Sequence, residues 1–131
     1  MRRLLPVVGA IALLAATGCK KINIEKSYDL EPGDNSNKIL IIDPPSREQQ
    51  IVVTATSSEA NIGVLILKGN DEKAIEQKPE KLRSEGAILA EKSGEKTITL
   101  EATIPAKTPY MVMVSLMENK KSAVKLTVKG K

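Results

Sequence analysis

The chain has no histidine, tryptophan or phenylalanine, and its 131 residues include one cysteine and two tyrosines. Without histidine or a spare thiol, it lacks the usual nucleophile and base pairs of enzymes and the usual ligands of a transition metal. Tyr28 and Tyr110 are too few for the aromatic platforms that stack sugars or unpaired bases, and Tyr110 is expected in the core with its hydroxyl bonded to a loop. The sequence therefore predicts a protein that is not an enzyme and carries no cofactor.

The chain also lacks a large excess of charge of one sign. The 20 basic residues stand against 16 acidic ones, and lysine and glutamate are interspersed along the chain. A nucleic-acid partner normally requires a one-signed patch that neutralises phosphates, so none is expected.

Long apolar runs are scarce as well. Arg2 and Arg3 precede the apolar stretch 4–16, which is shorter than the roughly 20 residues of a membrane-spanning helix. Thr17 and Gly18 then lead into Cys19. A positive start, a short apolar region and small residues before the cut are typical of a secretory signal peptide.

This arrangement resembles the lipobox of bacterial lipoproteins. The resemblance implies cleavage before Cys19, acylation of Cys19 and anchoring to membrane lipid; the alternative is an ordinary secretory signal followed by a free thiol. Loss of residues 1–18 removes Arg2 and Arg3, so the formal charge falls from +4 to +2. Lys20, where an aspartate would signal inner-membrane retention in enteric bacteria, favours the periplasmic face of the outer membrane.

The remaining chain is long enough for one domain, and its Val, Ile and Thr residues recur in short runs. Four runs alternate apolar and polar residues, as strands with one buried face do. Their apolar residues are Ile51, Val53 and Ala55; Ile98, Leu100, Ala102 and Ile104; Tyr110, Val112, Val114 and Leu116; and Val124, Leu126 and Val128. Two further runs, Ile39–Ile42 and Ile62–Leu67, are apolar at nearly every position and are predicted to be central strands.

Turn-forming residues separate these runs. They are Glu31–Asp34, Asp43–Ser46, Ser57–Ser58, Ser93–Gly94 and Glu118–Asn119. The charged stretch 70–85 is predicted to be a solvated connection with a short helix from Asp71 to about Gln77, leading to a strand at Ala87–Ala90. The fold is predicted to be all-β, a single antiparallel sandwich of seven or eight strands spanning 27–131, after a signal peptide (1–18) and a lipidated tether (19–26).

Three groups of residues carry a second family resemblance, which covers most of Tyr28 to Lys131. They are Leu30–Gly33; Gln50–Thr54 leading to Val64–Leu67; and Pro109–Val114 before Ala123–Val128. Their order is similar to that of the bacterial pre-peptidase C-terminal domain. That resemblance implies a jelly-roll β-sandwich that acts as an accessory or binding module.

The candidate ligand-binding residues are few. Oxygen ligands for calcium are offered by a group of residues around one turn and the following strand: Asp29, Asp34, Asn35, Asn37 and Asp43. These residues lack the spacing of an EF-hand loop, and the alternative is that they form turns. No metal site is therefore predicted, and calcium remains a weak candidate.

Two surface features suggest partners. Met111, Met113 and Met117 lie opposite the Tyr110 face of their strand, either as packing residues or as an adaptable surface for an envelope protein. Five lysines near the C-terminus indicate a solvated edge strand or an attraction to anionic lipid or cell-wall polymer: Lys120, Lys121, Lys125, Lys129 and Lys131. The function predicted is a lipid-anchored envelope module that binds protein or polymer; the alternative is an assembly lipoprotein that stabilises one envelope complex.

Overall fold

The computed structural model describes residues 22–33, 35–70, 84 and 86–131. Cys19, Asp34 and the helix expected at 71–77 lie outside these residues. Eight strands are present: β1 (Asn23–Leu30), β2 (Asn37–Ile42), β3 (Gln49–Ser57), β4 (Ile62–Lys68), β5 (Ile88–Glu95), β6 (Thr97–Ile104), β7 (Tyr110–Leu116) and β8 (Ser122–Gly130). Over the described part of the chain, no helix is both long and apolar enough to cross a bilayer.

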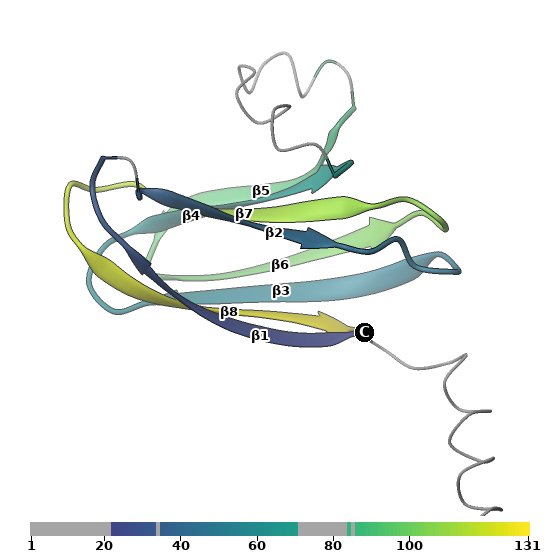
Figure 1. Ribbon diagram of the computed structural model, residues 1–131, viewed down its shortest axis with the longest axis horizontal. Helices are drawn as coiled ribbons and strands as arrows, with labels where there is room; N and C mark the ends of the chain where they lie inside the picture. The colour runs from purple at the N-terminus through teal and green to yellow at the C-terminus, as the bar shows by residue number, and fades with distance from the viewer. Residues whose placement is uncertain (1–21, 34, 71–83, 85) are drawn as a thin grey trace, which may run out of the picture.

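The strands form two antiparallel sheets that face each other (Figure 1). Sheet I has the order β1-β8-β3-β6 and sheet II the order β2-β7-β4-β5. Each sheet interleaves strands from both halves of the chain, which is the double Greek-key arrangement of a jelly roll. The all-β sandwich predicted from the sequence, with eight strands, is confirmed.

The core lies between the two sheets, where the alternating residues of each strand meet. The four alternating runs place their apolar faces as expected: Ile51, Val53, Ile98, Tyr110, Val112 and Val128 are all fully buried in one cluster. Side chains from both sheets interdigitate there, which is how stacked sheets exclude water. The period of two in the sequence therefore identified the inner faces.

Three strand-level expectations are corrected. The Ile39–Ile42 run forms β2, which is an edge strand, whereas the equally apolar Ile62–Leu67 run forms the interior strand β4 as expected. The lysine-rich strand β8 is interior and not an edge, because β1 and β3 flank it. β1 also begins at Asn23, inside the segment expected to be a tether.

The fifth strand extends through residues expected to form a turn. Ser93 and Gly94 lie within β5, where Ile62 pairs with Glu95 but Gly63 pairs with Ser93. The extra residue is Gly94, whose φ of 91° suits a glycine-containing β-bulge. A bulge therefore replaces the predicted turn, and the chain reverses at Lys96 instead.

The two ends of the sandwich differ in what they carry. Strand direction alternates along the chain, so β1, β3, β5 and β7 begin where β2, β4, β6 and β8 end. At this end the Gly130 N–H donates a 2.8 Å hydrogen bond to the Ile22 carbonyl, and the Lys131 N–H donates a 2.8 Å bond to the Gln50 carbonyl. We refer to it as the Ile22 end and to the opposite one as the far end.

A serine cluster closes the far end. The Ser122 Oγ lies 2.5 Å from the Ser57 Oγ and accepts backbone N–H bonds from Glu59 at 2.9 Å and Ala60 at 3.2 Å. Both serines are buried. Because these bonds join β8 to the β3–β4 connection, they hold the far-end loops against the sandwich.

Tyr110 contributes an unusual polar group to the core. Its side chain is 0% exposed, as the sequence predicted for its ring, but its hydroxyl has no hydrogen-bond partner within the described residues. The expected bond to a loop is therefore wrong. Burial raises the pKa of Tyr110 to about 12, because the charged phenolate cannot be solvated there.

This burial makes stability depend on alkaline pH. Below pH 10 the phenol is neutral in both states; above it the unfolded chain ionises while the folded phenol keeps its proton, so stability falls as pH rises from 10 through about 12. Relative to a Tyr110→Phe variant, the wild type should lose about 1.4 kcal/mol per pH unit in that range. Urea unfolding of both proteins from pH 8 to 11.5 measures this, and parallel pH profiles would contradict it.

Candidate functional site

The outer faces of the two sheets have opposite character. On sheet I the outward residues are mainly threonine, lysine and glutamate: Thr54, Thr56, Thr99, Glu101, Lys125 and Lys129. On sheet II, cross-strand pairing places Met113 between Ile39 and Leu65, and Met111 between Ile41 and Leu67. Across β2, β7 and β4, sheet II is thus largely apolar on both of its faces, although only one faces the core, whereas β5 adds Glu91 and Ser93 to the outer face.

Part of this outer face is already covered. Met111 and Leu67 are fully buried in a second apolar cluster, packed against the partly buried Ile39, Leu65, Ala87 and Ile88. The rest reaches solvent: the two exposed large hydrophobic residues in the described part of the chain are Ile41, 44% exposed, and Met117, 50% exposed. We call the accessible residues Ile39, Ile41, Leu65, Met113 and Met117 the outer apolar face.

A shallow hollow of about 180 Å³ lies on this face, lined by Gly63, Leu65, Met113, Met117 and parts of β5. Gly63 leaves room for the Met117 side chain, because a Cβ at Gly63 would lie 2.6 Å from the Met117 Cε and 3.1 Å from the Ser93 Cβ. The methionine therefore packs directly over the glycine. Its flexible thioether makes the wall of the hollow adaptable.

The backbone of Met117 is held in place by the neighbouring loop. Its N–H donates a 2.9 Å hydrogen bond to the Asn61 carbonyl, and the Asn61 N–H donates a 2.7 Å bond to the Glu118 Oε1. The Asn61 bond, and then the nearby Lys120, hold the pKa of Glu118 below its usual range. These hydrogen bonds thus fix the backbone position from which the Met117 side chain packs over Gly63.

None of the described strands pairs with the outer edge of β2, and this edge borders the same face. The Leu116 N–H donates to the Ser36 carbonyl at 2.8 Å, and bonded and non-bonded pairs alternate along an antiparallel ladder. The backbone groups of Asn37, Ile39 and Ile41 therefore point away from β7, toward the open edge. Lys38 is the one charged residue on β2, whereas the edge strand β1 carries Glu25, Lys26 and Asp29, so β2 has less of the charge that normally protects an edge.

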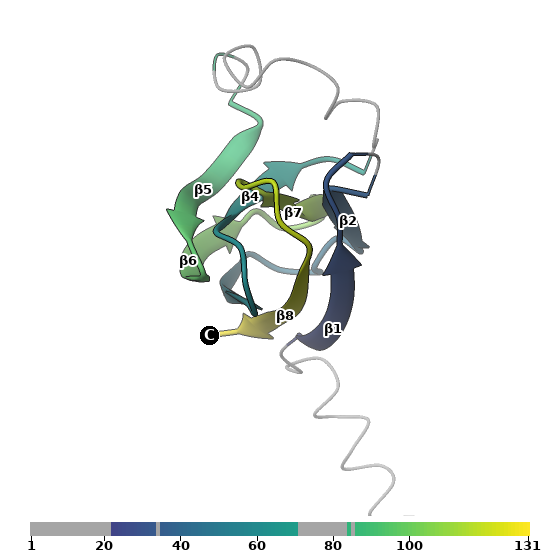
Figure 2. The ribbon, with the colours of Figure 1, turned by 90° about the vertical axis from the view of Figure 1, so that its left-hand side faces the viewer.

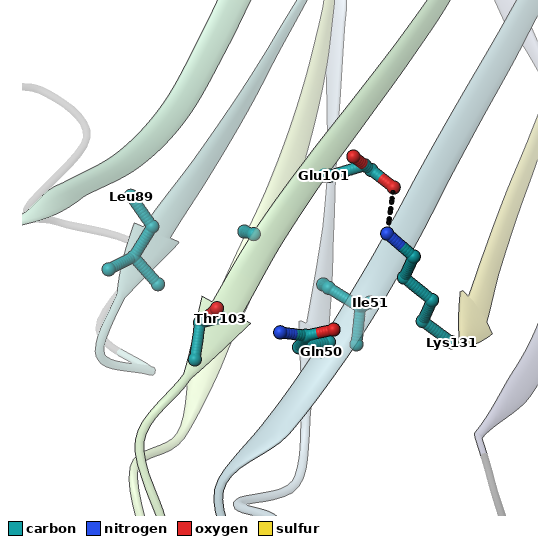
Figure 3. A pocket seen from close by; sticks show the side chains of 7 residues that line it. Gln50, Ile51, Leu89, Glu101, Thr103 and Lys131 are labelled. Carbon is teal, nitrogen blue, oxygen red and sulfur yellow. Dashed lines mark ion pairs between the residues drawn. The ribbon is translucent and has the colours of Figure 1, made fainter.

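Another hollow is polar. It has a volume of about 330 Å³ and is lined by Gln50, Ile51, Leu89, Glu101, Ala102, Thr103 and Lys131. Figure 3 shows Lys131 reaching across β3 to Glu101, where the Nζ–Oε1 distance is 2.8 Å. Because its two charged groups neutralise each other and are both exposed, this hollow has no unpaired group for acid–base chemistry.

The structure separates most of the residues singled out in the sequence. Met111 does not reach the surface, so only Met113 and Met117 of the three methionines belong to the outer apolar face. Asp29 lies toward the far end and Asp43 at the Ile22 end, and among the described residues no three acidic, histidine or cysteine side chains gather as metal ligands. The C-terminal lysines likewise divide between the two ends.

Sequence reasoning missed Ile41, Leu65 and Gly63. Ile41 and Leu65 lie in runs that the sequence predicts to be central strands covered on both sides. Nothing near Gly63 in the sequence indicates that the Met117 side chain packs against it. The near-continuous apolar runs of β2 and β4 were the signal for strands that are apolar on both faces.

No protein-family model and no curated protein matches the chain. Its fold is similar to that of two solved structures: the pre-peptidase C-terminal domain of a Bacillus anthracis collagenase (TM-score 0.60, 11% identity, 82% of this chain and 89% of that one) and a Yersinia pseudotuberculosis-derived mitogen (TM-score 0.56, 9% identity, 83% and 86%). At such identities the likeness concerns the fold alone. It agrees with the jelly roll that the sequence resemblance implied.

The contact between Gly63 and Met117 can be tested by a double-mutant cycle. Gly63→Ala should cost about 1 kcal/mol of stability, since overpacking forces Met117 aside. In a Met117→Ala background the same change should cost less, because only the 3.1 Å approach to Ser93 remains. Urea unfolding of the four proteins measures the coupling, and equal costs in both backgrounds would show that the methionine does not occupy this seat.

Proposed function

We propose that the chain is a lipid-anchored, non-catalytic binding module of the bacterial cell envelope, and that it contacts a protein partner through the outer apolar face and the edge of β2. The observation that carries this proposal is the apolar outer face of sheet II. A β-sandwich has one interior, and only one face of each sheet can be buried in it. A sheet that is apolar on both faces therefore presents an apolar outer face that can bind another molecule.

A polypeptide fits this surface better than a cell-wall polymer does. The accessible side chains of Ile41, Met113 and Met117 offer no hydrogen-bonding groups, and no aromatic ring lies among the residues of the face. Sugars are usually held by such rings and by polar groups. An extended peptide segment could bond to the outward backbone groups of Ile39 and Ile41 while its side chains lie on the face, as in strand addition.

The anchor is supported by the sequence alone. The apolar stretch 4–16 has the order of a secretory signal, and the Thr17, Gly18 and Cys19 that follow it resemble the lipobox of bacterial lipoproteins. Cys19 would then hold the domain at a membrane through acyl chains, with the periplasmic face of the outer membrane favoured by Lys20. The second candidate function is an assembly lipoprotein that stabilises one envelope complex. The edge of β2 favours it, because a sheet edge pairs with one added strand at a time and so binds one partner segment.

The proposal can be tested by co-purification from native membranes. A full-length chain with a C-terminal tag is recovered after gentle solubilisation, and bound proteins are quantified by mass spectrometry. We expect Ile41→Glu together with Met117→Glu to lower recovery of the main partner at least tenfold, because a charge on this face must be desolvated on binding. Both positions are half exposed, so the fold should be retained.

Two controls define the outcome. Thr56→Glu together with Thr99→Glu places the same added charge on the exposed outer face of sheet I and should leave recovery unchanged. Cys19→Ala should release the chain from the membrane fraction. One dominant partner near equal stoichiometry would favour the assembly role, several weaker ones the general binding module, and a partner retained by the Ile41→Glu and Met117→Glu variant would contradict binding through this face.

A further inference from the structure

The Ile22 end of the sandwich is the part of the domain that an anchor at Cys19 would bring closest to a membrane. Only Lys20 and Lys21 separate Cys19 from Ile22. At about 3.6 Å per extended residue, the Cα atoms of Cys19 and Ile22 can be no more than ~11 Å apart. Because the Ile22 carbonyl is bonded to Gly130 in the sandwich, the tether cannot lengthen by freeing more of the chain without breaking the β1–β8 pairing.

Two loops lie at the same end of the sandwich as Ile22 and the C-terminus. The Lys107 N–H donates a 2.7 Å hydrogen bond to the Pro45 carbonyl, so the β6–β7 and β2–β3 connections lie together. Figure 1 shows these connections on the same side of the sandwich as the C-terminus. Lys107 has a φ of 58°, a conformation that is uncommon outside glycine.

This end carries exposed cations that lack partners. Arg47, Lys68, Lys107 and Lys129 are exposed, and none of them forms an ion pair with a carboxylate of the described residues. The described carboxylates of this end that form no ion pair are Asp43 and Glu48, so among its described residues the unpaired cations outnumber the unpaired carboxylates.

The far end has a different charge arrangement. There Lys120 pairs with Glu118 at 3.7 Å and Lys121 with Glu31 at 3.3 Å. The described residues of this end that form no ion pair are the cations Lys38 and Lys96 and the carboxylates Asp29 and Glu59, which are equal in number. Among the described residues, unpaired cations therefore outnumber unpaired carboxylates at the end from which the tether leaves and not at the far end.

We infer that the Ile22 end is a membrane-contact surface that binds the anionic phospholipid headgroups of the membrane holding the anchor. The inference rests on the proposed lipid anchor, whose short tether allows this end to approach the headgroups to within about one Debye length. Basic residues at that distance are attracted to anionic lipid, and the attraction falls away beyond it. In this contact the strands would run away from the bilayer surface. The outer apolar face would lie at the side of the domain, and the far-end loops would point away from the membrane.

The test compares the two ends of the same acylated protein in vesicles. Single cysteines are introduced at Ala106, in the β6–β7 loop, or at Asn119, at the far end; both positions are exposed and uncharged. Each is labelled with a fluorophore, and the full chain is reconstituted into vesicles of phosphatidylcholine, with or without 30% phosphatidylglycerol, that contain a headgroup-attached quencher. Intact mass spectrometry first establishes whether Cys19 carries acyl chains.

We expect phosphatidylglycerol to increase quenching at position 106 at least threefold, and salt at 1 M to remove the increase, while position 119 stays unquenched. Replacing Arg47, Lys107 and Lys129 with glutamine should abolish the effect of phosphatidylglycerol at position 106. Equal quenching in neutral and anionic vesicles, or equal quenching at both ends, would overturn the inference but leave the anchor intact. A Cys19 without acyl chains would overturn the anchor and the inference together.

Discussion

A sandwich of two sheets has one interior, and this constraint decides how the rest of the molecule is arranged. Sheet I satisfies this constraint in the usual way, because its inner residues are apolar and its outer residues are mainly polar. Sheet II does not, since Met113, Leu65 and Ile41 continue the apolar character onto its outer surface. The cost of exposing this surface is reduced by the small cluster around Met111 and Leu67, and the remainder is left for contact with another molecule.

The jelly-roll order places three kinds of surface around that core. Interleaving of strands brings Ile22 beside Gly130 and joins the loops that contain Arg47 and Lys107, so one end gathers the tether and the unpaired cations. The opposite end is closed by serine hydroxyls and ion pairs. Figure 2, a view along the sandwich, shows β2 and β5 at opposite margins of sheet II, so the free edge of β2 and the bulged strand β5 border the same outer face. The proposed partner surface and the proposed membrane surface are therefore distinct and can be occupied together.

The strand pattern could be predicted from the sequence because alternation is a local property. Ile98, Val112 and Leu126 each follow a period of two, and all three are buried where that period placed them. Sheet order is not local: apolar runs of similar composition became the edge strand β2 and the interior strand β4, since pairing depends on which strands the connections bring together. The same limit applies to Gly94, which forms a bulge instead of a turn, and to Gly63, whose importance appears only when Met117 is placed above it.

The most direct test of the apolar outer face is the rate of methionine oxidation by dilute hydrogen peroxide, followed by mass spectrometry in purified protein and in native envelopes. Met117 is half exposed and Met111 is fully buried, so the chain provides its own reference. In purified protein Met117 should oxidise much faster than Met111. In envelopes, where a partner covers the face, we expect Met117 to be protected at least fivefold while Met111 remains slow. Equal oxidation of Met117 in the two preparations would contradict the account.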